Sequence, residues 1–235
     1  MEATGIIVLI ILCLILMGVA SYFDHSGDLS NLVLLLFIGI ALYIYRGGIV
    51  TEVGYAFEYF GNREKAIKIY TKAVELDPNY ARSYYFRGRA YYDDGEFFRA
   101  VADYTKAIEL DQDNSDFYYS RGLASSQLGH LDLAIIDFTK SIEFGPNHAD
   151  AYTNRGNAFR HKGDYEQALV DFTKAIEIDP DYESAYFNRG YTYLDIGYYD
   201  HAIKDFNRVI ELDRDNIDAY TNRGITYASK GNLSG

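Results

Sequence analysis

The sequence predicts an all-α fold: a right-handed α-solenoid of helix-turn-helix repeats with a period of 34 residues, preceded by one or two transmembrane helices. The main observation is an Arg-Gly dipeptide that recurs at this period: Arg87-Gly88, Arg121-Gly122, Arg155-Gly156, Arg189-Gly190 and Arg223-Gly224. A second glycine, an alanine and an aromatic residue recur at the same period. A long apolar stretch near the start of the chain predicts the membrane segment.

The first element is an apolar segment over residues 1–46, which we interpret as a membrane anchor. Residues 6–23 form a predominantly apolar stretch without a charged residue and would form about 27 Å of helix at ~1.5 Å per residue. After a short polar stretch, residues 29–45 form a second apolar run, which is long enough to span a membrane only marginally. We expect a helical hairpin.

The distribution of basic residues predicts the orientation of this anchor. No Lys or Arg precedes Arg46, whereas Arg63, Lys65 and Lys68 follow the second run. The positive-inside rule therefore places the repeat domain in the cytoplasm. The alternative is a signal peptide cleaved after Ala20, which would export the domain, but the start of the chain lacks a basic region.

The repeat region is expected to comprise five full units (47–80, 81–114, 115–148, 149–182 and 183–216) and a partial sixth (217–235). Each unit is predicted to form two helices. In the fourth unit, small and apolar residues from Tyr152 share one helical face, and Gly163 ends that helix. A second helix begins near Asp164 and ends at Asp179-Pro180, because proline cannot continue it.

These columns resemble the tetratricopeptide repeat family, whose 34-residue pattern combines aromatic residues, Leu-Gly, alanines and a terminal proline. The resemblance covers about four fifths of the chain. Arg takes the place of the family's usual Leu before the first glycine, and Gln112 and Arg214 replace the terminal proline. The first unit diverges most, as terminal repeats commonly do because they cap the stack.

Two sets of recurring residues are predicted to be structural. Small residues let the two helices of a unit approach closely: Gly88, Ala100, Gly122, Ala134, Gly156, Ala168, Gly190 and Ala202. The Arg before the glycine also occurs together with an Asp in the second helix of units two to five, and both are missing from unit one. We expect these residues to pair along the solenoid, the alternative being two independent solvated positions.

The resemblance implies a groove, formed by the first helices of successive units, that binds an extended peptide or a helix. The residues expected to line it are Tyr85, Phe86, Arg89, Tyr119, Thr153, Asn154, Asn157, Arg160, Phe187, Asn188, Tyr191 and Asn222. The recurring Asn can donate to and accept from a peptide backbone. The competing interpretation is that the aromatic residues pack between repeats. The family's chaperone-type carboxylate clamp is not expected, because Asp116 and Asp150 occupy positions that need a basic residue.

Composition disfavours several classes of function. The formal net charge is −12, of which residues 1–46 contribute −2, so the repeats are acidic and unsuited to nucleic acid. The five histidines show no metal-binding spacing, and Cys13 is the only cysteine. The recurring carboxylates are interpreted as repeat positions rather than as an acid–base pair. We expect no enzyme, no cofactor and no metal, and protein or peptide partners.

The leading hypothesis is therefore a membrane-tethered interaction scaffold. The alternatives are an exported or periplasmic component of envelope assembly or secretion, and the N-terminal regulatory part of a longer enzyme. The last alternative arises because the sequence stops after the first helix of unit six. Either the chain is a fragment, or that helix is the cap, or a partner covers it.

Overall fold

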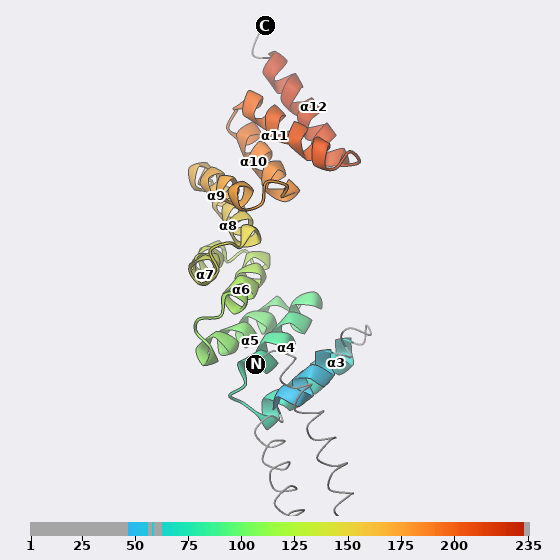
Figure 1. Cartoon of the computed structure of the whole chain (residues 1–235), viewed down its shortest axis with the longest axis vertical. Helices are drawn as coiled ribbons and strands as arrows, with labels where there is room; N and C mark the ends of the chain where they lie inside the picture. Colours follow the sequence, from blue (N-terminus) through green and yellow to red (C-terminus); the bar gives the residue numbers. More distant parts are fainter. Residues whose placement is uncertain (1–46, 56–57, 59–62, 233–235) are drawn as a thin grey trace, which may run out of the picture. The chain divides into compact units, whose positions relative to one another are not determined.

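The computed structural model describes residues 47–55, 58 and 63–232, and all regular secondary structure among them is α-helical (Figure 1). The chain divides into two compact units, residues 1–83 and 84–235. The helices are α3 (Arg63–Leu76), α4 (Ala81–Asp93), α5 (Phe97–Leu110), α6 (Ser115–Gln127), α7 (Leu131–Phe144), α8 (Ala149–His161), α9 (Tyr165–Ile178), α10 (Glu183–Asp195), α11 (Tyr199–Leu212) and α12 (Ile217–Asn232).

In the first unit, a helical stretch over residues 47–55 packs against α3. A Cβ atom on Gly54 would lie 2.4 Å from Cε1 of Tyr70, a ring that is fully buried. The Thr51 hydroxyl lies 2.8 Å from the Ser83 hydroxyl. The absence of a side chain at Gly54 therefore lets the helical stretch 47–55 approach α3 closely at the Tyr70 ring.

The second unit is a stack of helices in which each one contacts the next along the chain (Figure 1). First and second helices of a repeat pair as α6 with α7, α8 with α9 and α10 with α11. First helices of successive repeats also touch: α6 with α8, α8 with α10, and α10 with α12. Contacts within each repeat and between neighbouring repeats thus build the core, as in other solenoids.

Glycines in the left-handed region end the first helices. Gly95, Gly129, Gly163 and Gly197 have φ between +73° and +82°. A non-glycine residue would pay a steric cost there. In the fourth repeat, the Asp164 side chain caps the next helix by accepting from the Gln167 amide at 3.2 Å. Helix α9 then ends at Ile178, directly before Asp179-Pro180.

The core combines small residues with large rings. The four recurring alanines Ala100, Ala134, Ala168 and Ala202 are fully buried, as is Phe172. A Cβ on Gly156 would lie 2.8 Å from Cε1 of Phe172, so only glycine fits against that ring without displacing it. The recurring Gly and aromatic columns are therefore two halves of one contact between the helices of a repeat.

The predicted membrane anchor, residues 1–46 with spans over 6–23 and 29–45, lies outside the described residues. Among the residues that are described, no helix is both long enough and apolar enough to cross a membrane.

Candidate functional site

The recurring Arg and Asp form a ladder of buried ion pairs: Arg87–Asp103, Arg121–Asp137, Arg155–Asp171 and Arg189–Asp205. Each Arg donates from Nε and Nη2 to the two carboxylate oxygens at 2.7–2.9 Å. This bidentate geometry is the strong form of the Arg–carboxylate contact. The predicted pairing is confirmed.

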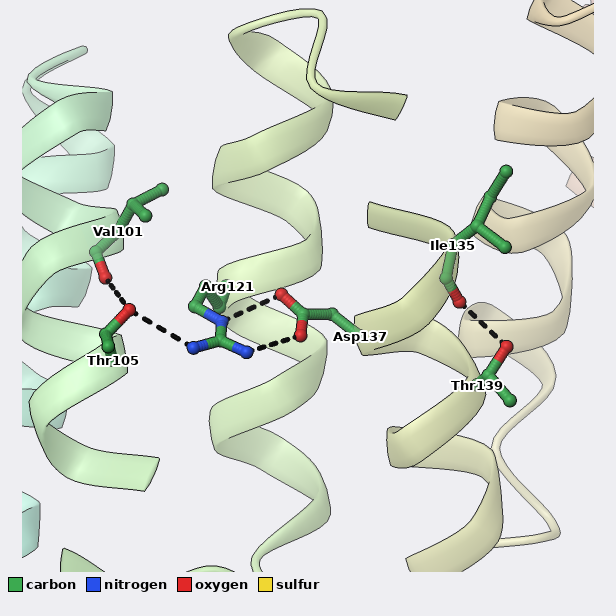
Figure 2. Close-up of polar contacts among 6 residues, drawn as sticks. All are labelled: Val101, Thr105, Arg121, Ile135, Asp137 and Thr139. Carbon is green, nitrogen blue, oxygen red and sulfur yellow. Dashed lines mark hydrogen bonds and ion pairs between the residues drawn. The ribbon is translucent and has the colours of Figure 1, made fainter. Parts of the chain in front are cut away.

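The third nitrogen of the Arg reaches back to the preceding repeat. Arg121 Nη1 donates to the Thr105 hydroxyl at 3.2 Å, so the guanidinium lies between two helices (Figure 2). The Thr105 hydroxyl can accept because it donates its own proton to the Val101 carbonyl. Arg155 and Arg189 make the same contact. The ladder therefore joins the third, fourth and fifth repeats each to its predecessor, which the sequence pattern did not reveal.

The ladder side chains are largely buried. The Asp171 side chain is 4% exposed and the Arg155 side chain 18% exposed. Burial raises the pKa of the Asp171 carboxyl, and the Arg155 guanidinium opposes that rise. The guanidinium also lies 5.6 Å from the Tyr152 ring centroid, a cation–π distance. The most regular residues of the chain thus hold the repeats together.

The predicted groove residues lie on another surface. We call the surface formed by α4, α6, α8, α10 and α12 the first-helix face. All of the predicted groove residues lie on these helices, but their surroundings differ from one column to the next. The aromatic residues, the Asn residues and the residues of α8 differ in their contacts and in their exposure.

The aromatic residues of this face pack within and between repeats. The Tyr85 ring lies 5.9 Å from the Tyr104 ring and 5.0 Å from the Phe117 ring of the next repeat. Tyr119 lies 5.9 Å from Phe138, and Phe187 lies 5.8 Å from Phe206. Tyr85, Tyr119 and Phe187 are each only partly exposed. The packing role that the sequence left open is thus present at these positions.

The Asn column has a uniform geometry. Asn154, Asn188 and Asn222 each donate from Nδ2 to the backbone carbonyl four residues earlier, at 2.8–2.9 Å. Asn154 also donates to the Tyr119 hydroxyl at 3.0 Å. No described residue donates to Oδ1 of the three amides. The column therefore presents a row of hydrogen-bond acceptors at 34-residue intervals.

Two predicted groove residues are buried. Phe86 is 8% exposed, and Arg89 lies over its ring at 4.9 Å. Thr153 is 3% exposed. The expectation that these two side chains line an open surface is corrected, because neighbouring side chains cover both. Asn157 is partly exposed.

Arg160 connects two neighbouring first helices. It projects from α8 to Asp195 of α10, with Nη1 donating to Oδ2 at 3.2 Å, and its guanidinium lies 4.8 Å from the Tyr191 ring centroid. Tyr191 and Arg160, both predicted groove residues, are therefore brought together. Asp195 was missed because an isolated carboxylate carries no sequence signal.

Acidic residues occupy the start of the first helices. Asp116 and Asp150 are both exposed, whereas the equivalent position of α4 holds Arg82. The Tyr182 hydroxyl donates to Asp150. Beside it, the Tyr119 ring lies 4.5 Å from the His148 ring, and burial raises the pKa of the Tyr119 phenol to about 12. This surface is suited to neutral or basic groups rather than to a carboxylate.

Two hollows lie away from this face, between the helices of a repeat. One of about 640 Å³ is lined by Tyr152, Arg155 and the exposed Val170, and one of about 510 Å³ lies at the equivalent place beside Arg189. Sequence reasoning did not identify them. Within the described part of the chain, no cluster of three or more His, Cys, Asp or Glu side chains is arranged to hold a metal ion.

Comparisons with known proteins identify the repeat. Models described as "TPR repeat" match residues 54–95, 88–129, 156–197 and 190–231, and models described as "Tetratricopeptide repeat" match residues 115–148 and 138–170. No curated protein sequence matches the chain.

Several solved structures share the fold. The sequence of MamA, known from a crystal structure, is 28% identical to this chain. The match covers 69% of this chain and 95% of the MamA chain, with a TM-score of 0.66. YrrB, described as "a TPR protein with an unusual peptide-binding site", is 24% identical. The match covers 74% of this chain and 90% of the YrrB chain, with a TM-score of 0.67. TTC0263, a thermophilic TPR protein of Thermus thermophilus, is 16% identical. The match covers 77% of this chain and 99% of the TTC0263 chain, with a TM-score of 0.59.

Proposed function

The chain belongs to the tetratricopeptide repeat family, and from this premise we propose that it is a membrane-tethered scaffold that binds peptide segments of other proteins on its first-helix face. The observation that carries the proposal is the row of amide oxygens at Asn154, Asn188 and Asn222. Their N–H groups are held by the helix backbone, which fixes the orientation of each amide. Fixed acceptors at regular intervals suit the N–H groups of an extended peptide.

The aromatic residues support this proposal in a different way. Tyr85, Tyr119 and Phe187 each use one part of the ring for packing and leave another part exposed. Rings that are already held by packing lose little conformational freedom on binding, and such anchors contribute strongly to affinity.

Tethering is proposed from the sequence of residues 1–46. Two apolar runs and the basic residues after them favour an anchor with the repeats in the cytoplasm. The test is extraction of membranes at alkaline pH with the full chain and with a variant lacking residues 1–46. We expect the full chain to stay with the membrane and the variant to be released. Equal release of both would refute the tether.

Peptide binding is tested by placing a photo-crosslinking amino acid at one position at a time in the full chain. Asn188 lies on the first-helix face, and Lys174 on the exposed surface of α9 serves as the matched control. The expected result is a set of crosslinked partner peptides from position 188 that is missing from position 174. The same partners at both positions in equal yield would remove the proposal.

A further inference from the structure

One side of helix α12 is uncovered although it carries residue types that the other first helices cover. Helix α12 lies beside α11 and also touches α10 (Figure 1). Its side chains Ala219 and Thr226 are fully buried. On the adjacent side, Tyr220 is 44% exposed, Tyr227 is 55% exposed, and Gly224 between them is exposed as well. These three residues follow one another at i, i+4 and i+7, so they share one helical face.

The preceding repeat shows what this side of a first helix contacts. In α10, Gly190 is buried, and a Cβ atom added to it would lie 3.2 Å from Cε1 of Phe206 and 3.1 Å from Cβ of Asp205. Both of these residues belong to the second helix of the repeat, α11. A Cβ atom on Gly224, the equivalent residue of α12, would meet nothing within 4 Å. The place that Phe206 and Asp205 fill in the fifth repeat is therefore open beside α12 in the described part of the chain.

Arg223 occupies the ladder position of α12 and is held at one end only. Its Nη1 donates to Asn207 Oδ1 of α11 at 2.7 Å, which repeats the contact of Arg189 with the preceding repeat. Its guanidinium also lies 5.2 Å from the Tyr220 ring centroid. In Arg189, Nε and Nη2 donate to Asp205 at 2.8 and 2.9 Å. No described residue accepts from the same two nitrogens of Arg223, so the stack fixes this guanidinium but supplies no carboxylate.

These features specify the chemistry of an occupant. Two neighbouring N–H donors of a guanidinium match the two oxygens of a carboxylate. An exposed glycine between two tyrosines leaves room for an aromatic ring, as Gly190 does for Phe206. In the fifth repeat the matching set is Ala202, Asp205 and Phe206, all buried against their neighbours. The occupant is therefore a helix that carries an alanine, an acidic residue three positions later and an aromatic residue directly after that.

We propose that Tyr220, Arg223, Gly224 and Tyr227 form a docking surface for such an amphipathic helix of another protein, and we call them the α12 docking surface. The docked helix supplies a carboxylate to Nε and Nη2 of Arg223 and an aromatic ring to Gly224. It completes the sixth repeat in trans, as α11 completes the fifth. The inference goes beyond the proposed function and does not depend on it, because Asn222 lies about 200° around the helix from Gly224 and so faces the opposite side.

A second copy of this chain does not fit as the occupant. Its own sets of this kind, such as Ala168, Asp171 and Phe172, are buried inside its repeats, and Asp171 already has its arginine. Supplying one of these helices would leave a largely buried guanidinium without its counter-charge, which is costly. Two copies that met through α12 itself would bring together two Arg223 side chains. The acidic residue of α12, Asp218, lies on the opposite side of the helix and cannot compensate them.

The experiment measures the binding of a helical probe to the full chain purified in detergent. The probe is a fluorescein-labelled peptide of residues 198–213, kept helical by a hydrocarbon staple between positions 204 and 211, which are exposed in the chain. Fluorescence polarisation compares wild type with Arg223→Gln and Gly224→Leu. The matched control is Arg214→Gln, which removes the same charge from an exposed arginine just before α12.

The expected result is a loss of affinity of at least about tenfold for Arg223→Gln and for Gly224→Leu, and of less than about twofold for Arg214→Gln. Gly224→Leu makes the test independent of folding, because the first added atom meets nothing in the unbound chain and thermal unfolding should not occur earlier. In the peptide, Asp205→Asn should weaken binding by at least about tenfold. The peptide control Asp200→Asn removes a carboxylate that is exposed in the fifth repeat and should leave affinity within about twofold.

A charge reversal tests the contact itself. Arg223→Asp in the chain, combined with Asp205→Arg in the peptide, should bind at least about fivefold more tightly than either change alone. No gain from the reversal, binding of Arg223→Gln or Gly224→Leu within twofold of wild type, or no binding to wild type at peptide concentrations up to about 1 mM would each overturn the inference.

The oligomeric state of the chain without the probe provides a last test. We expect sedimentation as a monomer. A dimer that Gly224→Leu dissociates would overturn the inference, because the occupant would then be a second copy. None of these results affects the crosslinks expected from Asn188, so a failure of the docking surface and a failure of the proposed function are distinguishable.

Discussion

Removing one partner of a ladder pair should destabilise the fourth repeat strongly. Arg155 makes two hydrogen bonds to Asp171 at 2.7 and 2.8 Å and a third to Thr139 at 3.0 Å, and the two charged side chains are 18% and 4% exposed. Replacing Asp171 by Ala leaves a guanidinium that is largely buried without its counter-charge. Breaking a buried pair in this way costs about 3–5 kcal/mol.

The assay is urea unfolding of the full chain followed by circular dichroism, with hydrogen exchange of the α8 and α9 amides as a local readout. The matched control is Lys174→Ala, which removes a partner of Glu177. That pair lies on α9 with a similar N–O distance of 2.9 Å, but its side chains are 48% and 59% exposed. We expect little change in the free energy of unfolding, because water screens an exposed pair.

A double replacement shows whether the lost stability comes from a buried charge left without its partner. Arg155→Met with Asp171→Leu removes both charges and keeps apolar volume, so it should recover most of the stability lost in either single variant. If Asp171→Ala costs no more than Lys174→Ala, the reasoning from burial is refuted. If the double variant is as unstable as the sum of the single ones, the two side chains are not energetically coupled.

A glycine of the helix contact and a buried tyrosine provide two further tests. Gly156→Ala should lower the free energy of unfolding by about 1–3 kcal/mol, because the new Cβ meets the Phe172 ring at 2.8 Å. The control Gly224→Ala in α12 should raise the free energy of unfolding by about 0.5–1 kcal/mol, because nothing lies within 4 Å of the added Cβ. Thermal melts in which both variants shift in the same direction would contradict this expectation. Burial raises the pKa of Tyr119 to about 12, so the folded state favours the neutral phenol. The resulting contribution to the free energy of unfolding is fully present below the unfolded pKa of ~10 and is lost as the pH rises to about 12. The urea midpoint of wild type should therefore fall more between pH 9 and pH 11.5 than that of Tyr119→Phe, and parallel decreases would refute the assignment.

The sequence determined most of the repeat architecture. The glycine at +82° in the turn, Gly163, and the end of α9 before Pro180 could be predicted because they reflect constraints on single residues. The Arg–Asp pairing could also be predicted, because Val53 and Ile69 replace both partners in the same repeat. Each of these features is written in local chemistry or in a column that recurs.

Only the tertiary structure decided how residues of different helices meet. The Thr105 hydroxyl that receives Arg121 belongs to the preceding repeat, and periodicity alone does not say which helices touch. The burial of Thr153 and the contact of Arg160 with Asp195 depend on the packing and rotamers of non-repeating side chains. The repeat pattern thus fixes the scaffold because every unit must stack on the next in the same way. The pattern does not fix side chains that depart from it, such as those of α8, because the effect of a departure depends on the side chains packed around it.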